Sequence, residues 1–188
     1  VMGRHTMRVD WHGPGEKVFA TEKREMTVYR VPGGQLVEFA SRLASTLGKV
    51  NLDGDPQHAG FQFRAAQEVA DGDQKLTYYL RPDGQGKPGE SRNWAGKNPD
   101  PRTVNLPWNA MSFVIDGHRY TAVYLDNPAN PKEARYSERS YGRFGSYFEY
   151  ELDEGSRLDV NYRVWLQDGE MTGDQAAALS ADFAEPVL

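Results

Sequence analysis

The feature that most constrains the fold of this chain is a strict alternation of apolar and polar residues near its C-terminus. Every second residue between Arg157 and Gln167 is apolar: Leu158, Val160, Tyr162, Val164 and Leu166. Successive side chains of a β-strand point to opposite faces, so this period of two predicts a half-buried strand. The chain is therefore expected to build a sheet that packs one face on a core.

Similar patterns recur along most of the sequence. Ser146–Leu152 alternates in the same way, and Asp153–Ser156 has the composition of a turn, so these residues and the C-terminal strand are predicted to form a hairpin. Further strands are expected at Val18–Tyr29, Leu36–Leu43, Ala59–Glu68, Leu76–Leu80, Met111–Ile115 and Arg119–Leu125. Short strands at this spacing predict an all-β fold, an antiparallel β-sandwich.

One helix is predicted, at about Gly173–Ala184. Thr172 precedes it and Gln175 follows three residues later, which is the pattern of a capping box. We expect this short C-terminal helix to brace the sheet. No linker divides the sequence, so residues 1–188 are expected to be a single domain. Strand-like sequence begins almost at Val1, which favours the C-terminal portion of a longer protein.

Composition argues against several classes of partner. The net charge of −5 comes from interspersed charges of both signs, so nucleic acid is not an expected partner. No segment approaches the roughly 18 apolar residues of a membrane span, and no membrane partner is expected. The absence of cysteine excludes thiol nucleophiles and thiolate metal sites, but it is compatible with both the bacterial periplasm and the cytoplasm.

The residues from Arg81 to Pro107 are rich in glycine, proline and asparagine, which predicts a functional or disordered loop. Gly84–Gly89 matches the spacing of a dinucleotide fingerprint, but Pro88 and the prolines that follow are incompatible with the helix that such a site needs. Asp53, Asp55 and His58 are better explained by turn chemistry than by a cation site. No cofactor and no metal are expected.

Three polar side chains are predicted to share one face of a strand: His58, Gln62 and Arg64. Residues two apart on a strand stand about 7 Å from one another, so this row could hold a polyhydroxylated or carboxylated ligand. In an enzyme, His58 would be the general acid and base and Arg64 would stabilise negative charge, while Gln62 would bind the substrate. The alternative is that His58 only caps the turn at Gly54–Pro56.

A second candidate surface follows the strand predicted at Arg119–Leu125. Its substrate-binding candidates are Arg135, Tyr136, Arg139, Tyr141 and Arg143. Guanidinium groups are forked donors for hydroxyls and carboxylates, and aromatic rings suit the apolar face of a sugar. The alternative is that Glu133 and Glu138 pair with these arginines at the surface.

Four further residues are predicted to belong to this surface. Asp126, Asn127 and Asn130 lie in Asn-Pro turns that would hold the loop in one shape, which lowers the entropy lost on binding. Trp108 could stack on a ligand, although an indole that anchors a loop to the core is the commoner role.

These segments resemble the C-terminal part of a bacterial family of unknown function that has long carried the label "methane oxygenase PmoA". The resemblance covers most of the chain and is specific in the Asp126–Pro131 turn and in Tyr141–Phe144, while Gln57–Arg64 is similar to that family's Gly-Phe-x-x-Arg strand. The methane label does not fit, because a copper monooxygenase subunit needs membrane spans or a histidine-rich site. The resemblance implies instead a sandwich of the galactose-mutarotase type with a role near carbohydrate breakdown.

Members of that family carry an N-terminal His-x-His-Arg-like segment, where this chain has only Arg4-His5 and Trp11-His12. A missing N-terminal portion is therefore an expected partner. The predicted function is binding or processing of a sugar or sugar acid on a concave face, and whether the chain is an enzyme is left open. Two alternatives are a non-catalytic carbohydrate-binding or accessory module and a purely structural domain of a larger protein.

Overall fold

The main sheet of the protein has eight strands, and all its pairings are antiparallel. In this computed structural model, which describes residues 2–94 and 97–184, the strand order is β1-β2-β3-β13-β9-β8-β6-β7. The strands are β1 (Met2–His12), β2 (Val18–Val31), β3 (Gly34–Ser45), β13 (Arg157–Asp168), β9 (His118–Asp126), β8 (Trp108–Ile115), β6 (Tyr78–Arg81) and β7 (Gly84–Gln85). The alternation at 157–167 thus forms a central strand, between β3 and β9.

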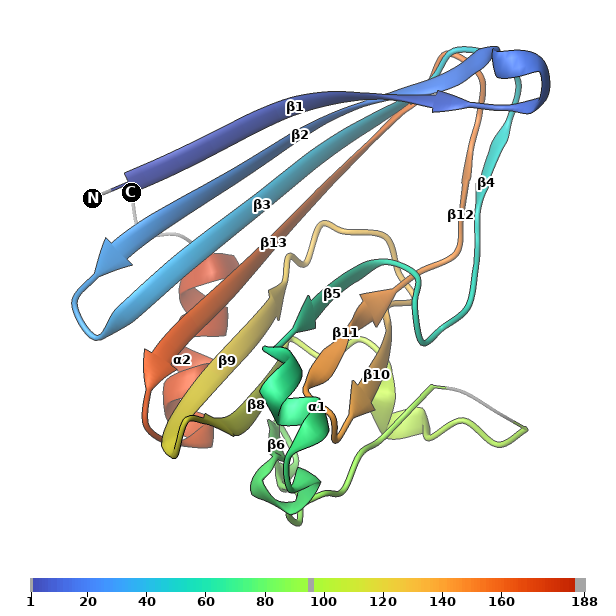
Figure 1. The fold of residues 1–188 in the computed structure, drawn as a ribbon. Coiled ribbons are helices and arrows are strands. Elements are labelled where there is room, and N and C mark those ends of the chain that lie inside the picture. Colours follow the sequence, from blue (N-terminus) through green and yellow to red (C-terminus); the bar gives the residue numbers. More distant parts are fainter. Residues whose placement is uncertain (1, 95–96, 185–188) are drawn as a thin grey trace.

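Five shorter strands form a second layer over one face of the main sheet (Figure 1). Three of them pair in the order β10 (Arg135–Arg139), β11 (Arg143–Tyr147) and β5 (Phe61–Arg64), and the other two are β12 (Tyr150–Leu152) and β4 (Val50–Leu52). The prediction of an antiparallel all-β sandwich is confirmed. The remaining short helices are α1 (Gln67–Asp71) and three 3-10 turns, at Pro14–Glu16, which joins β1 to β2, and at Gln74–Leu76 and Pro101–Thr103.

Aromatic side chains fill much of the space between the two layers. Phe61 of β5 stacks on Tyr162 of the main sheet with ring centroids 4.8 Å apart, and Phe144 of β11 packs edge-on against Tyr79. Tyr79 and Phe144 are fully buried. Each large ring removes much apolar area from water, so the contact between layers is the main source of stability in this half of the molecule.

Helix α2 (Gly173–Ala184) covers the opposite face of the main sheet, where it packs on β8 and β9. Its capping box forms as predicted. The Thr172 Oγ1 accepts from the Gln175 backbone N–H (3.2 Å), and the Gln175 Oε1 accepts from the Thr172 backbone N–H (2.9 Å). Ala176 is buried against Trp108 and Met171. Within the described residues, no helix is long and apolar enough to cross a membrane.

One predicted strand pairing and the extent of one predicted strand were wrong. The segment 146–152 is interrupted at Phe148, and β12 pairs with β4 instead of forming a hairpin with β13. The turn at Asp153–Ser156 does form and leads into β13, which pairs with β3. At the start of this pairing the Ser45 N–H donates to the Ser156 carbonyl. The strand predicted at Ala59–Glu68 is confined to Phe61–Arg64, and helical turn α1 follows.

Candidate functional site

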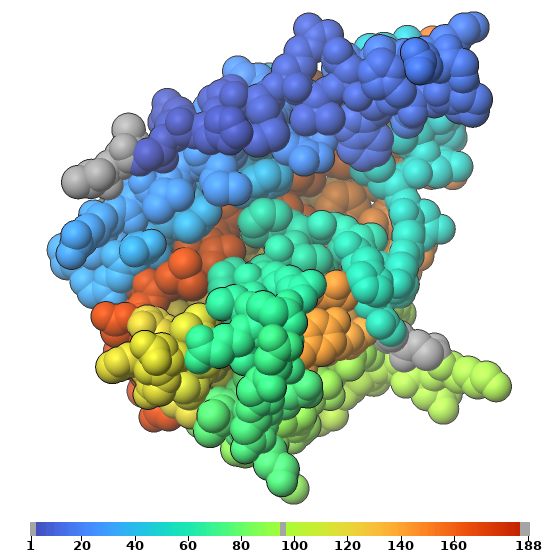
Figure 2. All heavy atoms as spheres, viewed as in Figure 1, coloured from blue at the N-terminus to red at the C-terminus, as the bar shows by residue number. Residues whose placement is uncertain are grey.

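A cavity of about 580 Å³ opens between the second layer and the long N-terminal strands. Figure 2 shows the surface hollowed between these strands and the segment around residues 50–64. Its walls come from β1, β2, β3, β4, β5 and β13. The aromatic residues that line it are Trp11, Phe39, Phe61, Phe148 and Tyr162. A concave site with aromatic walls and a few polar groups is typical of small-molecule binding.

A buried carboxylate forms the polar part of this cavity. Glu22 is 5% exposed, and its Oε1 accepts hydrogen bonds from Arg24 Nε and Ser41 Oγ, both at 2.6 Å. Its Oε2 accepts from Arg24 Nη2 (2.7 Å) and Trp11 Nε1 (3.0 Å). Burial by itself would raise the pKa of Glu22, but the bonds from Arg24 and Ser41 outweigh it and hold the pKa below its ordinary value. The carboxylate is therefore ionised and fixed in position.

Alternation along three neighbouring strands brings these groups together. Arg24 lies opposite Ser41 in the β2–β3 ladder and Met7 in the β1–β2 ladder, and directly opposite residues point to the same face. Glu22 is two residues from Arg24 on that face. The sequence contains this signal as polar residues at the inward positions of β2 and β3, where a core strand would carry apolar ones.

His58 lies at the cavity, but in a turn and not on the predicted strand. Its backbone N–H donates to the Asp55 carbonyl at 2.9 Å, and its Nδ1 hydrogen-bonds to Asp55 Oδ2. The Asp55 carboxylate also accepts from the Gln57 N–H, and these two bonds lower the pKa of Asp55. When the ring is neutral, a carboxylate at Nδ1 favours the tautomer with its proton there, which leaves Nε2 as an acceptor. The turn interpretation therefore describes His58, and its imidazole also lines the cavity.

Gln62 lines the same cavity, so two of the three predicted residues of this segment come together. Its Nε2 donates to the Ala59 carbonyl (3.0 Å), and its buried Oε1 has no hydrogen-bond partner within the described residues. Gly60 allows the backbone before β5 to pass close to β11. It has a φ of 77°, and a Cβ there would lie 2.1 Å from the Ser146 carbonyl oxygen. Arg64 is exposed, donates to Gln67 and lines a different cavity.

The second predicted surface forms a hairpin instead of an open binding loop. Tyr136 is fully buried, and its hydroxyl donates to the Leu106 carbonyl at 2.7 Å, so it cannot offer a ring to a ligand. Arg135 pairs with Glu133 and Glu149 and lies over the Trp94 ring. The predicted alternative of ion pairing therefore describes Arg135.

Arg139 and Arg143 are held by neutral groups. Arg139 donates to the Asn93 side chain and to the Glu138 carbonyl, and Arg143 donates to the Gln57 carbonyl. The guanidinium of Arg143 also lies over the Tyr141 ring, 5.9 Å from its centroid. These contacts use donors that the sequence analysis assigned to a ligand, and none of these residues lines the cavity beside His58.

Two buried side chains, Asp126 and Asn130, hold the Asp126–Pro131 turn in place. Asn130 donates to Asp126 Oδ1 (2.6 Å) and to the Asn161 carbonyl (2.7 Å), while the Asn127 side chain accepts from the Ala129 N–H. Burial raises the pKa of Asp126, although Lys132 opposes the effect. Trp108 is 4% exposed beneath α2, which places it in the core and not at a ligand. None of Asp126, Asn127, Asn130 and Trp108 lines the cavity.

A buried ion pair that the sequence analysis missed ties the long loop to the hairpin. Arg81 donates to Glu138 through Nε (2.8 Å) and Nη2 (2.5 Å), and Asn109 donates to the same carboxylate at 3.0 Å. The Arg92 backbone N–H also donates to it, at 2.7 Å. Glu138 lies two residues from Tyr136, on the same face of β10, but sequence spacing gives no indication that its partner stands 57 residues earlier.

Metal-ligand groups are not assembled in the described part of the chain, where no three His, Cys, Asp or Glu side chains could hold an ion together. The Asp53, Asp55 and His58 string forms a turn held by Asp55, in line with turn chemistry.

Comparison with known proteins gives a family and no activity. The sequence model of a family described only as a family of unknown function (DUF6807) matches residues 1–181. No curated protein matches the chain.

Proposed function

Because the chain belongs to this family of unknown function, which carries no activity with it, we propose a function from the cavity itself: it binds a sugar or sugar acid between β2, β3 and β5. The observation that carries the proposal is the combination of aromatic walls with the fixed Glu22, Arg24 and Ser41 cluster and with His58 at the same cavity. Aromatic rings suit the C–H faces of a sugar, and forked or fixed polar groups suit its hydroxyls.

The polar groups would play different parts. The Glu22 carboxylate already accepts four hydrogen bonds, so it orients Arg24 rather than meeting the ligand itself. Arg24 Nη1 makes none of those four bonds and would donate to a hydroxyl or carboxylate. His58 Nε2, left as an acceptor by the Asp55 contact, would take a proton from a ligand hydroxyl if the site is catalytic.

We also propose that the chain is related to the PmoA-labelled family and that its sandwich is of the galactose-mutarotase type. They are supported by the patterns Asp126–Pro131 and Tyr141–Phe144. A non-catalytic carbohydrate-binding module would use the same cavity without proton transfer at His58. The hairpin surface is not part of the proposed site, because its arginines are already engaged.

Binding can be tested by titrating D-glucose, D-galactose and D-glucuronate into the protein and following amide shifts by NMR. Asn51→Trp would fill the cavity from the exposed face of β4 and should abolish saturable shifts. Lys23→Trp is the matched control, because Lys23 lies beside Glu22 on the opposite face of β2 and does not line the cavity. Shifts that survive Asn51→Trp, or no shifts with any of the three sugars, would refute the proposal.

His58→Gln separates the enzyme from the binding module. The side chain is 60% exposed, so the variant should fold and bind sugar as the wild type does. If His58 is the general base, conversion of a bound sugar should fall by about 100-fold or more in the variant. Equal conversion by the two proteins would exclude that role and favour a non-catalytic module.

A further inference from the structure

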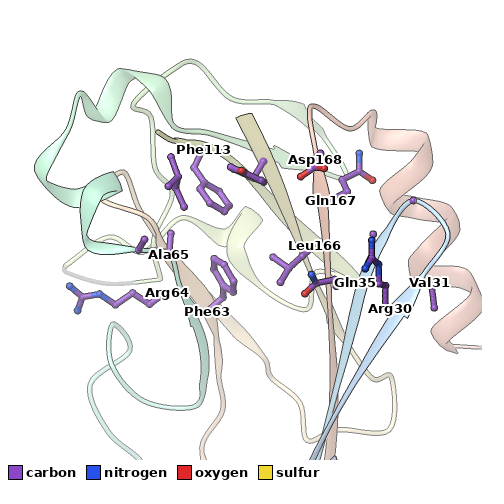
Figure 3. Close-up of a pocket in the computed structure, with 15 residues that line it drawn as sticks. Arg30, Val31, Gln35, Phe63, Arg64, Ala65, Phe113, Leu166, Gln167 and Asp168 are labelled. Atoms are coloured by element: carbon purple, nitrogen blue, oxygen red, sulfur yellow. The ribbon is translucent and has the colours of Figure 1, made fainter. Parts of the chain in front are cut away.

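A second cavity, of about 710 Å³, lies further along the same four strands β2, β3, β5 and β13 (Figure 3). Phe63 and Arg64 of β5 line it, whereas Phe61 and Gln62 line the first cavity. The two cavities share no lining residue. The stacked rings of Phe39, Phe61 and Tyr162 form the end of the first cavity that faces the second.

The floor of this second cavity is apolar. Phe63 lies 6.1 Å from Phe113 between ring centroids, and Phe113 lies 6.1 Å from Tyr120. Leu166 and Ile115 complete the floor, and Figure 3 shows the Phe63, Phe113 and Leu166 side chains gathered at its centre. An apolar floor of this kind favours a ligand with an aryl or alkyl body, because burying that body releases water from both surfaces.

The rim carries an unsatisfied positive charge. Arg30 stands at the end of β2, and its guanidinium makes no ion pair or hydrogen bond within residues 2–94 and 97–184. Arg64 follows Phe63 on β5, where its side chain points away from the centre of the cavity (Figure 3) and donates to the neutral Gln67. Among the described residues that line the cavity, Asp168 is the single acidic one, so Arg30, Arg64 and Asp168 together leave one net positive charge.

Arg30 differs from other arginines of the long strands, which form ion pairs. Its neighbours on the long strands are neutralised, as Arg24 is by Glu22 and Arg42 by Asp159. A free guanidinium beside an apolar cavity meets the requirements of a carboxylate attached to an apolar body, since the fork binds both carboxylate oxygens. A dianion is disfavoured because Asp168 shares the rim.

We propose that this second cavity is a binding site for an amphipathic monocarboxylate, with its apolar body on Phe63 and Phe113 and its carboxylate on Arg30. Arg64, whose side chain points outward beyond Phe63, adds only long-range attraction. The site is independent of the sugar cavity, because no residue is common to the two.

The test compares 3-phenylpropionate with 3-phenylpropan-1-ol, which has the same apolar body without the charge, by isothermal titration and saturation-transfer NMR. The acid should bind saturably and the alcohol at least about tenfold more weakly. Arg30→Gln should weaken binding of the acid by about tenfold, and Arg30→Glu should abolish it. Both variants should fold, because Arg30 is exposed.

Arg157→Gln is the matched control, since Arg157 is an exposed arginine of β13 outside the cavity, and it should leave the affinity unchanged. Equal affinities for acid and alcohol, an Arg30→Glu variant that binds as the wild type does, or no binding of the acid at all would each overturn the proposal. Because the sugar titration reports on the other cavity, either proposal can fail while the other stands.

Discussion

Arg81 and Glu138 form a two-point ion pair in which each side chain is only 1% exposed, between the first residues of the long loop and the β10 strand. Asn109 and the Arg92 backbone N–H complete the shell around the carboxylate. A buried pair of this kind adds little net stability compared with apolar residues, but removal of one partner leaves a charge without compensation. The pair therefore fixes the loop on the hairpin.

The first prediction follows from that asymmetry. Glu138→Gln should lower the free energy of unfolding by about 3–5 kcal/mol, because the buried Arg81 charge keeps only the partly exposed Glu90, 4.0 Å away, as a counter-ion. The double variant Arg81→Met, Glu138→Leu should lose less than Glu138→Gln alone. Urea unfolding followed by tryptophan fluorescence measures both. Asp100→Asn is the control: its partner Arg102 is 60% exposed, and the change should stay within about 1 kcal/mol. A Glu138→Gln variant as stable as this control would contradict the prediction.

The second prediction concerns acid stability. The folded-state pKa of Glu22 lies below its ordinary value of 4.5, so between the two values the unfolded chain binds more protons. The stability that Glu22 contributes is therefore present above about pH 4.5 and is lost as the pH falls through the folded pKa. Urea titrations at several pH values from 6 down to 3 should show a shallower decline for Glu22→Gln than for the wild type. Parallel declines would show that Glu22 is not the group responsible.

Alternation and capping could be read from the sequence because they depend on neighbouring residues. The Arg157–Gln167 strand and the Thr172–Gln175 box occur where their patterns placed them. The predicted hairpin between 146–152 and the C-terminal strand does not form. The turn Asp153–Ser156 specifies a reversal of the chain but not which strands pair, and β12 pairs with β4 from about 100 residues earlier.

The candidate site was less accessible to sequence reasoning. His58 and Gln62 were found because short-range patterns marked them, whereas Glu22, Arg24 and Ser41 join them only through strand pairing over long separations. The predicted ligand-binding role of the arginine-rich hairpin depends on long-range contacts in the same way. Its residues have the composition of a binding loop, but tertiary contacts with Glu133, Asn93 and Gln57 engage its donors.

The third prediction tests the C-terminal helix. Thr172→Ala removes the acceptor for the Gln175 N–H at the start of α2 and should cost about 1 kcal/mol of stability, while Thr172→Ser should cost a few tenths. Thermal unfolding by circular dichroism measures both. Because Ala176 and Leu179 pack on the sheet, a loss in the alanine variant no larger than in the serine variant would mean that packing alone holds the helix.

The fourth prediction concerns the ring stack between the two cavities. Phe61 has ring centroids 4.8 Å from both Phe39 and Tyr162, with interplanar angles of 26° and 13°. Phe61→Ala should lower the free energy of unfolding by about 2–3 kcal/mol, below the range for a fully buried phenylalanine because this ring is only half-buried. Phe61→Leu should cost less, since it keeps the wall between the cavities. In the alanine variant the two cavities should join, and 3-phenylpropionate should then perturb the amide signals of Ser41 and Leu43 as well as those of Phe63. Perturbation restricted to the second cavity would show that other residues keep the two apart.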